Sequence, residues 1–369
     1  MPGTHPKQIA EASTGTTASH FPQCHSEAYA LKIALSSNCP SGAWLTSMLP
    51  TLLLGAKRRP MVFFNVGANK GFAVSAMLQR VRRASFNSMD WFRAFLGHVS
   101  SRARLSRTSR GLGELCGACC PCVEQPPLLP SRHAVDVYAF EFLPENVQWL
   151  NASFDAFGIR DHVKLIHAAV SNASGSAYVD KIAEPGSESH VVQDTPSSDG
   201  NVTTVVVPRL ALSDFVHSQG IEHIDLLSVD TEGHDALVLE GARPLLEAGR
   251  VATLEFEYHK VGFWGARHPD RRPLRDTLSS LDAMSYACFW QGRHGCIAPA
   301  NGPCWSPKFE FHAWSNLVCA HRDLPTFSVL SSISETCRNT SGAFREPLDR
   351  APLDAVRHMG VHVHKRCFA

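Results

Sequence analysis

The feature that most constrains the fold of this chain is a regular alternation of short apolar runs with stretches of helical length and pattern. The apolar runs cover residues 61–66, 134–142, 163–170, 224–230 and 251–259. Short, continuous runs of this kind predict strands that are covered on both faces. Because helical patterns separate most of them, the sequence favours an α/β fold with a mostly parallel sheet and helices on both faces. A β-branched run at 201–208 predicts an extra strand, in a hairpin over the sheet.

The alternation is interrupted between residues 82 and 132, where the chain is rich in Arg, Ser, Gly, Pro and Cys. Such a composition is a poor source of packed core and predicts a disordered insertion. Gly67 and Glu141 are 74 positions apart, and 23 apart once these 51 residues are left out. The shorter spacing is typical of a nucleoside-binding fold.

A glycine-containing turn follows the first predicted strand, in the sequence FFNVGANKGF (63–72). Ligands of doubly wound sheets bind beyond the carboxyl ends of the strands, where glycine permits close backbone approach. Gly67 and Gly71 flank Ala68 and Asn69, without the middle glycine that a pyrophosphate-binding turn requires. A nicotinamide oxidoreductase is therefore disfavoured. A ligand with an amino-acid tail suits the turn better, and S-adenosylmethionine is such a ligand.

An acidic residue, Glu141, ends the second predicted strand. In nucleoside-binding sheets, an acid about 20 residues after the glycine turn accepts hydrogen bonds from the ribose hydroxyls. We therefore expect Glu141 to bind the ribose of the cofactor.

Four segments in this order carry a family resemblance: FFNVGANKGF, YAFEFLPENVQWL, HAAVSNASGSAYV and IDLLSVDTEGHDALVLEGARPLL. Together they resemble the FkbM-type family of S-adenosylmethionine-dependent methyltransferases, over roughly residues 61 to 260. The resemblance implies a Rossmann-like class I methyltransferase fold of seven strands with the last pair antiparallel. It also implies methyl transfer, usually to a hydroxyl oxygen of a sugar, lipid or small metabolite. Residues 285–290 and 312–319 are candidates for strands six and seven.

The sequence departs from the family pattern at three places. Asn65 stands where family members often carry aspartate, and Phe142 where proline usually follows the acid. The third departure is the insertion, which falls between the glycine turn and Glu141 and would reshape the site if it folds over it. Asn65 can still hydrogen-bond the turn, so we expect it among the cofactor-binding residues Asn65, Gly67, Ala68, Asn69, Gly71, Glu141 and Asp230.

Polar residues follow the fourth and fifth strands, where the acceptor hydroxyl would meet the methyl group. We expect Asp230 and Glu232 to act in catalysis, with His234 or His259 as the base that accepts the hydroxyl proton. Structural roles are the alternative, and Asp235 in particular is a residue type that caps helices. Glu255 and Glu257 share one face of a strand, so one of them is a candidate for pairing with Arg or Lys. Asp230 and neighbouring acids could hold magnesium, but nothing requires a metal and none is expected.

Cysteines and glycosylation acceptors bear on the compartment. The chain has 12 cysteines, four of them in the run CGACCPC (116–122), and Asn-X-Ser/Thr acceptors at Asn151, Asn172, Asn201 and Asn339. These features favour disulfides and a glycoprotein of the secretory lumen, whereas the polar residues after Met1 contain no apolar signal segment. Lumen and cytoplasm both stay open. Mobile thiols are favoured over zinc for the cysteine run, and Cys296 and Cys304 could close a loop.

Charge and length exclude other classes. With 35 basic and 34 acidic side chains in 369 residues, the chain lacks the basic field that nucleic-acid binding needs. The apolar stretch 43–56 is too short for a bilayer and contains Pro50. We expect an N-terminal extension (1–60), a methyltransferase domain (61–320) and a C-terminal extension (321–369). The predicted function is O-methylation of a small-molecule or glycan hydroxyl; the alternative is a non-catalytic binding domain that retains the fold.

Overall fold

The structure of the chain is a computed structural model. It describes residues 21–37, 39–40, 42–56, 59–81, 83–102, 119, 133–180, 192–193, 204–293 and 295–339.

The centre of the fold is an eight-stranded sheet in the order β11-β10-β12-β9-β8-β1-β2-β3. The strands are β1 Met61–Val66, β2 Val135–Glu141, β3 Val163–His167, β8 Ile224–Val229, β9 Val251–Tyr258, β10 Tyr286–Gln291, β11 Ile297–Pro299 and β12 Ser315–His321. The five strands from β3 to β9 are parallel, and β12 runs antiparallel to both β9 and β10. This arrangement confirms the predicted Rossmann-like fold, with the sixth and seventh strands where the sequence suggested. The count differs by one, because β11 adds an antiparallel edge strand to β10.

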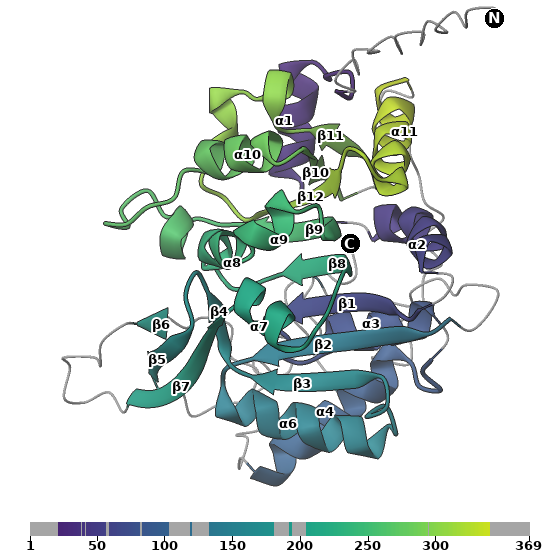
Figure 1. The fold of residues 1–369 in the computed structure, drawn as a ribbon, viewed down its shortest axis with the longest axis vertical. Helices are drawn as coiled ribbons and strands as arrows, with labels where there is room; N and C mark the ends of the chain where they lie inside the picture. The colour runs from purple at the N-terminus through teal and green to yellow at the C-terminus, as the bar shows by residue number, and fades with distance from the viewer. Residues whose placement is uncertain are drawn as a thin grey trace, which may run out of the picture.

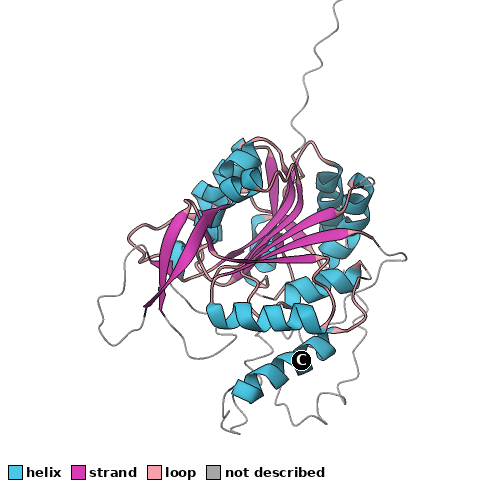
Figure 2. Ribbon diagram, turned by 60° about the horizontal axis from the view of Figure 1, so that its bottom comes forward, coloured by secondary structure: helices cyan, strands magenta, loops and turns pink. Residues whose placement is uncertain are grey.

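Helices cover both faces of the sheet (Figures 1 and 2). Alternate side chains of a strand point to opposite faces, so Phe63 packs in one core and Phe64 in the other. The Phe63 core is covered by α2 Ala43–Gly55, α3 Phe72–Arg80, α4 Ser88–Arg102, α6 Pro144–Ala156 and α11 Pro325–Asn339. The Phe64 core is covered by α1 Glu27–Leu35, α7 Leu212–Ser218, α8 Asp235–Gly241, α9 Arg243–Glu247 and α10 Leu274–Ala283.

A second, four-stranded sheet in the order β4-β7-β5-β6 lies at the left of Figure 1. Its strands are β4 Ala169–Ser171, β5 Gly175–Asp180, β6 Val192–Gln193 and β7 Thr204–Ala211. The run predicted as one strand at 163–170 is divided at Ala168, whose N–H donates to the Glu141 carbonyl (3.1 Å). β4 then leaves the main sheet and pairs with β7, which in turn runs antiparallel to β5. The β-branched run is thus a strand, as predicted, but it belongs to a separate sheet rather than to a hairpin over the main one.

The predicted insertion requires a correction, because its first part is folded. Helix α4 places Trp91, Phe92 and Phe95 in the core with no exposed surface. The overall Arg and Ser content of 82–132 obscured the apolar spacing of these aromatic residues, which is typical of a buried helix face. Residues 103–118 and 120–132 lie outside the described part of the chain.

The folded unit also extends past the predicted domain limits of 61 and 320. Helices α1 and α2 precede residue 61, α11 follows residue 320, and all three contribute side chains to the two cores. Their apolar residues therefore cover the β10, β11 and β12 end of the sheet.

Four disulfides connect distant parts of the described chain: Cys24–Cys304, Cys39–Cys119, Cys288–Cys319 and Cys296–Cys337. The suggested closure of a loop by Cys296 and Cys304 is wrong, since each bonds to a terminal segment instead. Cys119, in the run read as mobile thiols or zinc ligands, is bonded to Cys39 and so belongs to neither class. No cysteine in the described residues is free.

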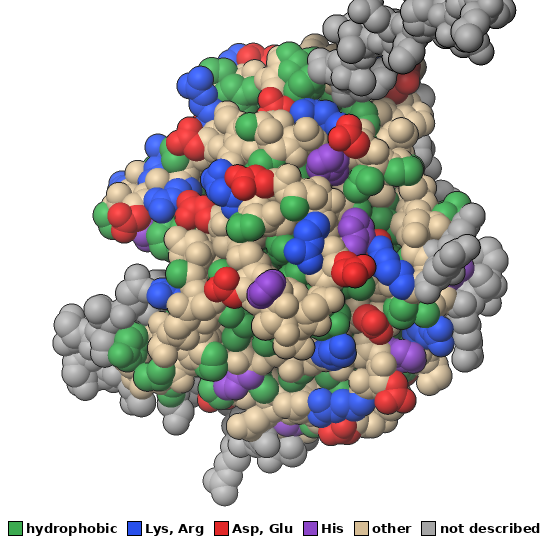
Figure 3. Space-filling view, viewed as in Figure 1, with side chains coloured by type: hydrophobic (Ala, Val, Ile, Leu, Met, Phe, Trp, Pro, Cys, Tyr) green, Lys and Arg blue, Asp and Glu red, His purple; other side chains and the backbone are tan. Residues whose placement is uncertain are grey.

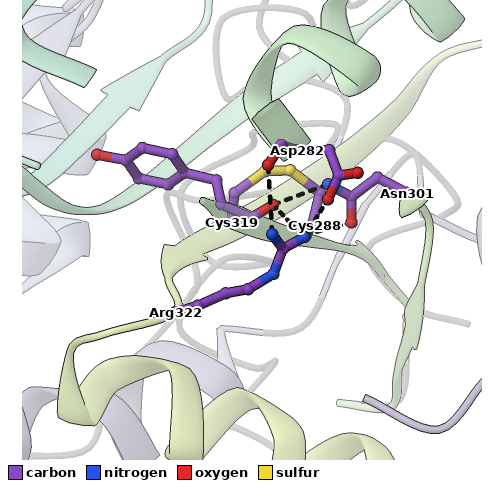
Figure 4. The surroundings of a disulfide bond; sticks show 6 residues. Asp282, Cys288, Asn301, Cys319 and Arg322 are labelled. Carbon is purple, nitrogen blue, oxygen red and sulfur yellow. Dashed lines mark hydrogen bonds and ion pairs between the residues drawn. A yellow bond between two sulfur atoms is a disulfide. The ribbon is translucent and has the colours of Figure 1, made fainter. Parts of the chain in front are cut away.

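The Cys288–Cys319 disulfide joins directly opposite positions of β10 and β12 (Figure 4). The Asn301 side chain accepts from the Cys288 N–H (2.9 Å) and donates to the Tyr286 carbonyl (2.8 Å). Arg322 donates to the Asp282 carboxylate beside it. The antiparallel end of the sheet is therefore fixed by both covalent and polar links.

Two further properties of the described residues concern surface charge and helix length. On the face shown in Figure 3, acidic and basic side chains are interspersed rather than gathered by sign. Among the described helices, none has the length and apolar character that a bilayer span requires.

Candidate functional site

The glycine turn after β1 is held against two neighbouring strands. The N–H groups of Gly67 and Ala68 donate to the Phe140 carbonyl on β2 (3.1 and 2.9 Å). Gly67 has φ +84°, and a Cβ there would lie 1.8 Å from the carbonyl oxygen of Asp230. Glycine is thus required by both conformation and space. As a result, the turn after β1 touches the first residue after β8.

The second half of the turn is supported by tryptophans. The Lys70 carbonyl accepts from the indole N–H groups of Trp91 and Trp149 (2.8 and 3.1 Å). Gly71 has φ +77°, and a Cβ there would lie 2.7 Å from both Trp91 and Leu150. Helix α4, from the predicted insertion, therefore packs directly behind the predicted cofactor turn.

The Glu141 carboxylate connects this turn to the end of β2. It accepts from the N–H groups of Asn69 (2.7 Å), Phe142 (2.9 Å) and Leu143 (2.8 Å). The side chain of Asn146 also hydrogen-bonds to it. Glu141 is only 3% exposed, and this burial raises its pKa against the lowering effect of those hydrogen bonds. The protein itself supplies the donors that a ribose was expected to supply.

Two acceptor oxygens at the same end of β1 receive no hydrogen bond from the described residues. They are Oδ1 of Asn65 and Oδ1 of Asn69, and both are buried. A buried amide oxygen that lacks a donor is costly. The ammonium group of an amino acid would supply the missing donors, so the residues present fit the methionine tail of S-adenosylmethionine.

The loop after β8 is organised by Asp235, which is fully buried. Its carboxylate accepts from the Thr231 hydroxyl (2.9 Å) and the N–H groups of Gly233 (3.2 Å) and Glu257 (3.1 Å). Burial, together with the charge of Asp230, raises the pKa of Asp235 to about 7. Asp235 is the first residue of α8 and His234 is its N-cap, so Asp235 joins the loop to β9 rather than capping the helix from the N-cap position.

Glu232, Glu257 and His259 converge beside this loop. One possible metal-ligand atom from each residue lies within 4.8 Å of those of the other two. Burial, followed by the charges of Asp230, Asp235 and Glu232, raises the pKa of Glu257 well above its usual range. Burial lowers the pKa of His259, so the imidazole is neutral near neutral pH. The carboxyl edge of β8 and β9 is therefore rich in groups that can accept a proton.

Trp314, the residue immediately before β12, completes this group. Its indole N–H donates to Oε1 of Glu257, and its ring centre lies 6.3 Å from that of His259. The register of β9 and β12 explains the meeting, because Ser315 is opposite Tyr258.

His234 is directed elsewhere. Its Nε2 lies 3.0 Å from the Ser171 hydroxyl on β4, and its ring is in edge contact with Phe263 (5.1 Å). The structure thus associates His234 with the second sheet, whereas the other candidate base, His259, lies with Glu232 and Glu257.

Glu255 has the kind of basic neighbour expected for one of the two strand carboxylates. It interacts electrostatically with Arg80 and hydrogen-bonds to Ser228. Gln291 donates to its Oε2 (3.4 Å). The carboxylate near a basic residue is therefore Glu255, while Glu257 lies among acids.

The loop at 260–273, which follows β9, contacts the loop after β8. The Phe263 N–H donates to the Gly233 carbonyl (2.8 Å). Two of its arginines are in ion pairs, Arg271 with Glu310 (3.2 Å) and Arg272 with Glu240 (2.6 Å). Trp264 is fully buried. These three side chains therefore hold the loop in place.

The ends of β1, β2, β8 and β9 could be predicted from the sequence, but Glu257 was not among the predicted site residues. Its position two residues before His259 could have indicated that it belongs to the site. No signal pointed to Trp314, because the contact depends on the pairing of β12 with β9.

A model of a known protein family matches the part of the chain that contains most of these strand ends. Residues 127–283 match the model of the methyltransferase FkbM domain. The match includes β2, β8 and β9; β1 and its turn precede it, but β1 pairs with both β2 and β8. Curated protein sequences give no match.

Two solved structures that match this chain resemble it only weakly. The methyltransferase FkbM from Methylobacillus flagellatus KT has 9% identity and a TM-score of 0.33, covering 71% of this chain and 43% of its own. The chain therefore spans less than half of that relative. The precorrin-6y C5,15-methyltransferase from Geobacter metallireducens GS-15 has 9% identity and a TM-score of 0.26, covering 73% of this chain and 86% of its own.

Replacing Gly67 by alanine should destabilise the protein by about 2–4 kcal/mol, because a positive φ and a backbone clash act together. The matched control is Gly97→Ala on helix α4, where a Cβ meets nothing within 4 Å. That change should stabilise by up to about 1 kcal/mol. Urea unfolding measures both variants, and equal stabilities would contradict the close approach of Gly67 and Asp230.

Replacing Glu141 by glutamine should destabilise the protein by about 1–3 kcal/mol, since an amide N–H₂ would face backbone N–H donors. Glu247→Gln, at a half-exposed carboxylate of α9, is the control and should change little. Thermal and urea unfolding give the comparison. A Glu141→Gln protein as stable as the control would show that the carboxylate does not hold the turn.

The acids at the β8–β9 edge predict a pH dependence. The pKa of Glu257 is higher in the folded than in the unfolded chain, so its stabilising contribution is complete at low pH and is lost as pH rises. Glu257→Gln should therefore gain stability relative to the wild type as the pH rises above the ordinary range of a glutamate carboxyl. Urea unfolding of both proteins in a chelating buffer measures this difference, and a pH-independent difference would refute the raised pKa.

Proposed function

We propose that the protein, whose residues 127–283 match the methyltransferase FkbM domain, transfers a methyl group from S-adenosylmethionine to a hydroxyl oxygen. The observation that carries the proposal is the contact of Gly67 with Asp230. It brings the predicted cofactor turn beside the acids that end β8 and β9.

The cofactor tail is assigned to the end of β1. Backbone groups of Gly67, Ala68 and Gly71 shape the turn, and the amide oxygens of Asn65 and Asn69 accept from the ammonium group. Support comes from the buried Oδ1 atoms of both asparagines, which have no donor within the described part of the chain. Glu141 contributes by holding Asn69 in place, and its position at the end of β2 sets the side on which the ribose lies.

When bound, the cofactor supplies a methyl group attached to a sulfonium sulfur. As the oxygen–methyl bond forms, the sulfur–methyl bond breaks and the sulfur becomes a neutral thioether. The protein has to place the acceptor oxygen in line and receive its proton. Asp230 is exposed at the end of β8, beside the turn, and is the proposed proton acceptor. Glu232 and neutral His259 are assigned to orienting the acceptor hydroxyl.

The negative charge at the carboxyl edge of β8 and β9 favours a methyl acceptor that is uncharged. Asp230 and Glu232 both act on the pKa of buried Glu257, so negative charges are close together here. An anionic substrate such as a phosphate or carboxylate would be repelled. We therefore assign the acceptor to neutral hydroxyl compounds, on a sugar, glycan or small metabolite.

A second candidate function is binding without catalysis. The Glu141 carboxylate already accepts three backbone N–H groups and so offers little to a ribose. Calorimetry with S-adenosylmethionine, S-adenosylhomocysteine and NAD separates the candidates. Binding of the first two supports the methyltransferase, and binding of none of them favours the second candidate.

The compartment proposed for this activity is oxidising. Four disulfides occur in the described residues, and disulfides persist mainly in the secretory pathway and outside the cell. The acceptor sites Asn172 and Asn339 are exposed, as glycosylation requires.

Asp230→Asn should lower methyl transfer by about 100- to 10,000-fold, because the amide cannot accept the proton. Affinity for S-adenosylhomocysteine should change much less, since the proposed tail contacts are kept. Asp276→Asn, at an exposed position of α10, is the control. Labelled cofactor and a mass-spectrometric screen of neutral and anionic glycans provide the assay. Unchanged transfer in Asp230→Asn would remove Asp230 from catalysis.

A further inference from the structure

The group formed by Glu232, Glu257 and His259 has the composition of a cation site. Its members come from the loop after β8 and from the end of β9, and their donor atoms lie within 4.8 Å of one another. Ligands on opposite sides of a small divalent cation are about 4.2 Å apart, given bonds of about 2.1 Å. Small side-chain adjustments would bring all three ligand atoms into coordination range.

Two of the three residues have a buried polar atom without a hydrogen-bond partner among the residues that the structure describes. These atoms are Oε2 of Glu257 and Nδ1 of His259. Glu257 as a whole is only 4% exposed. A buried carboxylate oxygen without a donor is unfavourable, and buried charges are normally paired or bound to a metal. This unpartnered oxygen indicates a ligand independently of the clustering of acids.

Trp314 orients the buried carboxylate. Its indole N–H donates to Oε1 of Glu257, which leaves Oε2 as the atom available for coordination. Hydrogen bonds of this type fix the orientation of metal-binding carboxylates. The same ring lies beside His259, so one side chain packs against two of the three donors.

We propose that Glu232, Glu257 and His259 bind a divalent transition-metal cation. Two carboxylates and one neutral imidazole suit manganese, iron or zinc, whereas magnesium and calcium prefer oxygen ligands alone. The absence of a thiolate from the group argues against a soft ion. The two positive charges of the cation offset part of the repulsion between Glu232, Glu257 and the nearby Asp230, so the three carboxylates still leave this group negatively charged.

A role for the cation rests on the proposed function. Beside the cofactor turn, it would bind the acceptor hydroxyl through an oxygen lone pair and lower its pKa. The proton then passes to Asp230 as the oxygen–methyl bond forms. This role restricts acceptors to hydroxyl compounds whose oxygen can reach the cation.

The test is calorimetric titration of the full-length, untagged, chelator-treated protein with MnCl₂, followed by competition with ZnCl₂ and MgCl₂. We expect one Mn²⁺ site that Zn²⁺ displaces and that excess Mg²⁺ does not. Electron paramagnetic resonance counts the bound Mn²⁺ without reference to activity. No saturable Mn²⁺ or Zn²⁺ binding would overturn the proposal.

Variants locate the site among the 19 histidines of the chain. Glu257→Gln and His259→Asn should each weaken Mn²⁺ binding by at least roughly 10–100-fold. Glu247→Gln, on α9, should bind as the wild type does. Circular dichroism checks the fold, and His259→Asn keeps the test decisive if Glu257→Gln does not fold. Wild-type affinity in a folded variant would overturn the assignment.

The outcomes also separate this inference from the proposed function. Site-specific Mn²⁺ binding without methyl transfer to any acceptor supports the metal site and counts against the methyltransferase. Methyl transfer that is unaffected by chelation, in a protein that binds no Mn²⁺ or Zn²⁺, supports the methyltransferase and overturns the metal site.

Discussion

The close approach of Gly67 to the Asp230 carbonyl determines how the rest of this site can be arranged. A Cβ at Gly67 would overlap that oxygen, so the turn after β1 and the loop after β8 can meet only because residue 67 is glycine. Glu141 fixes the other side of the turn through Asn69. With both contacts in place, the turn that is proposed to hold the cofactor lies next to the acids proposed to act on the acceptor.

The acids at this edge, Asp230, Glu232, Asp235 and Glu257, lie close together although their negative charges repel one another. Asp235 offsets part of the cost by accepting three hydrogen bonds from its surroundings. Glu257 has fewer partners, and its pKa is raised by burial and by three neighbouring carboxylates. A folded protein retains such an arrangement mainly where function uses it, because perturbed carboxylates are concentrated in active sites. The proposed proton transfer and the proposed cation binding would both make use of it.

Much of this arrangement could be predicted from the sequence, because strand periodicity fixes which residues end each parallel strand. Gly67, Glu141, Asp230 and His259 were all placed at the same edge in this way. The hydrogen bonds of the Glu141 carboxylate could not be predicted, because its donors are backbone N–H groups whose positions depend on local backbone geometry. Trp314 was missed for a different reason: its contact with Glu257 depends on the antiparallel register of β12. Average composition also concealed α4, although the spacing of Trp91, Phe92 and Phe95 contained the signal.

The central claim is that the end of β1 binds the amino-acid tail of S-adenosylmethionine beside Asp230. A crystal structure of the protein soaked with S-adenosylhomocysteine tests it most directly. The account predicts the ligand's ammonium group within hydrogen-bonding distance of the Asn65 and Asn69 amide oxygens, with its sulfur facing Asp230. A ligand bound elsewhere on the protein, or crystals that take up none at saturating concentration, would contradict the account.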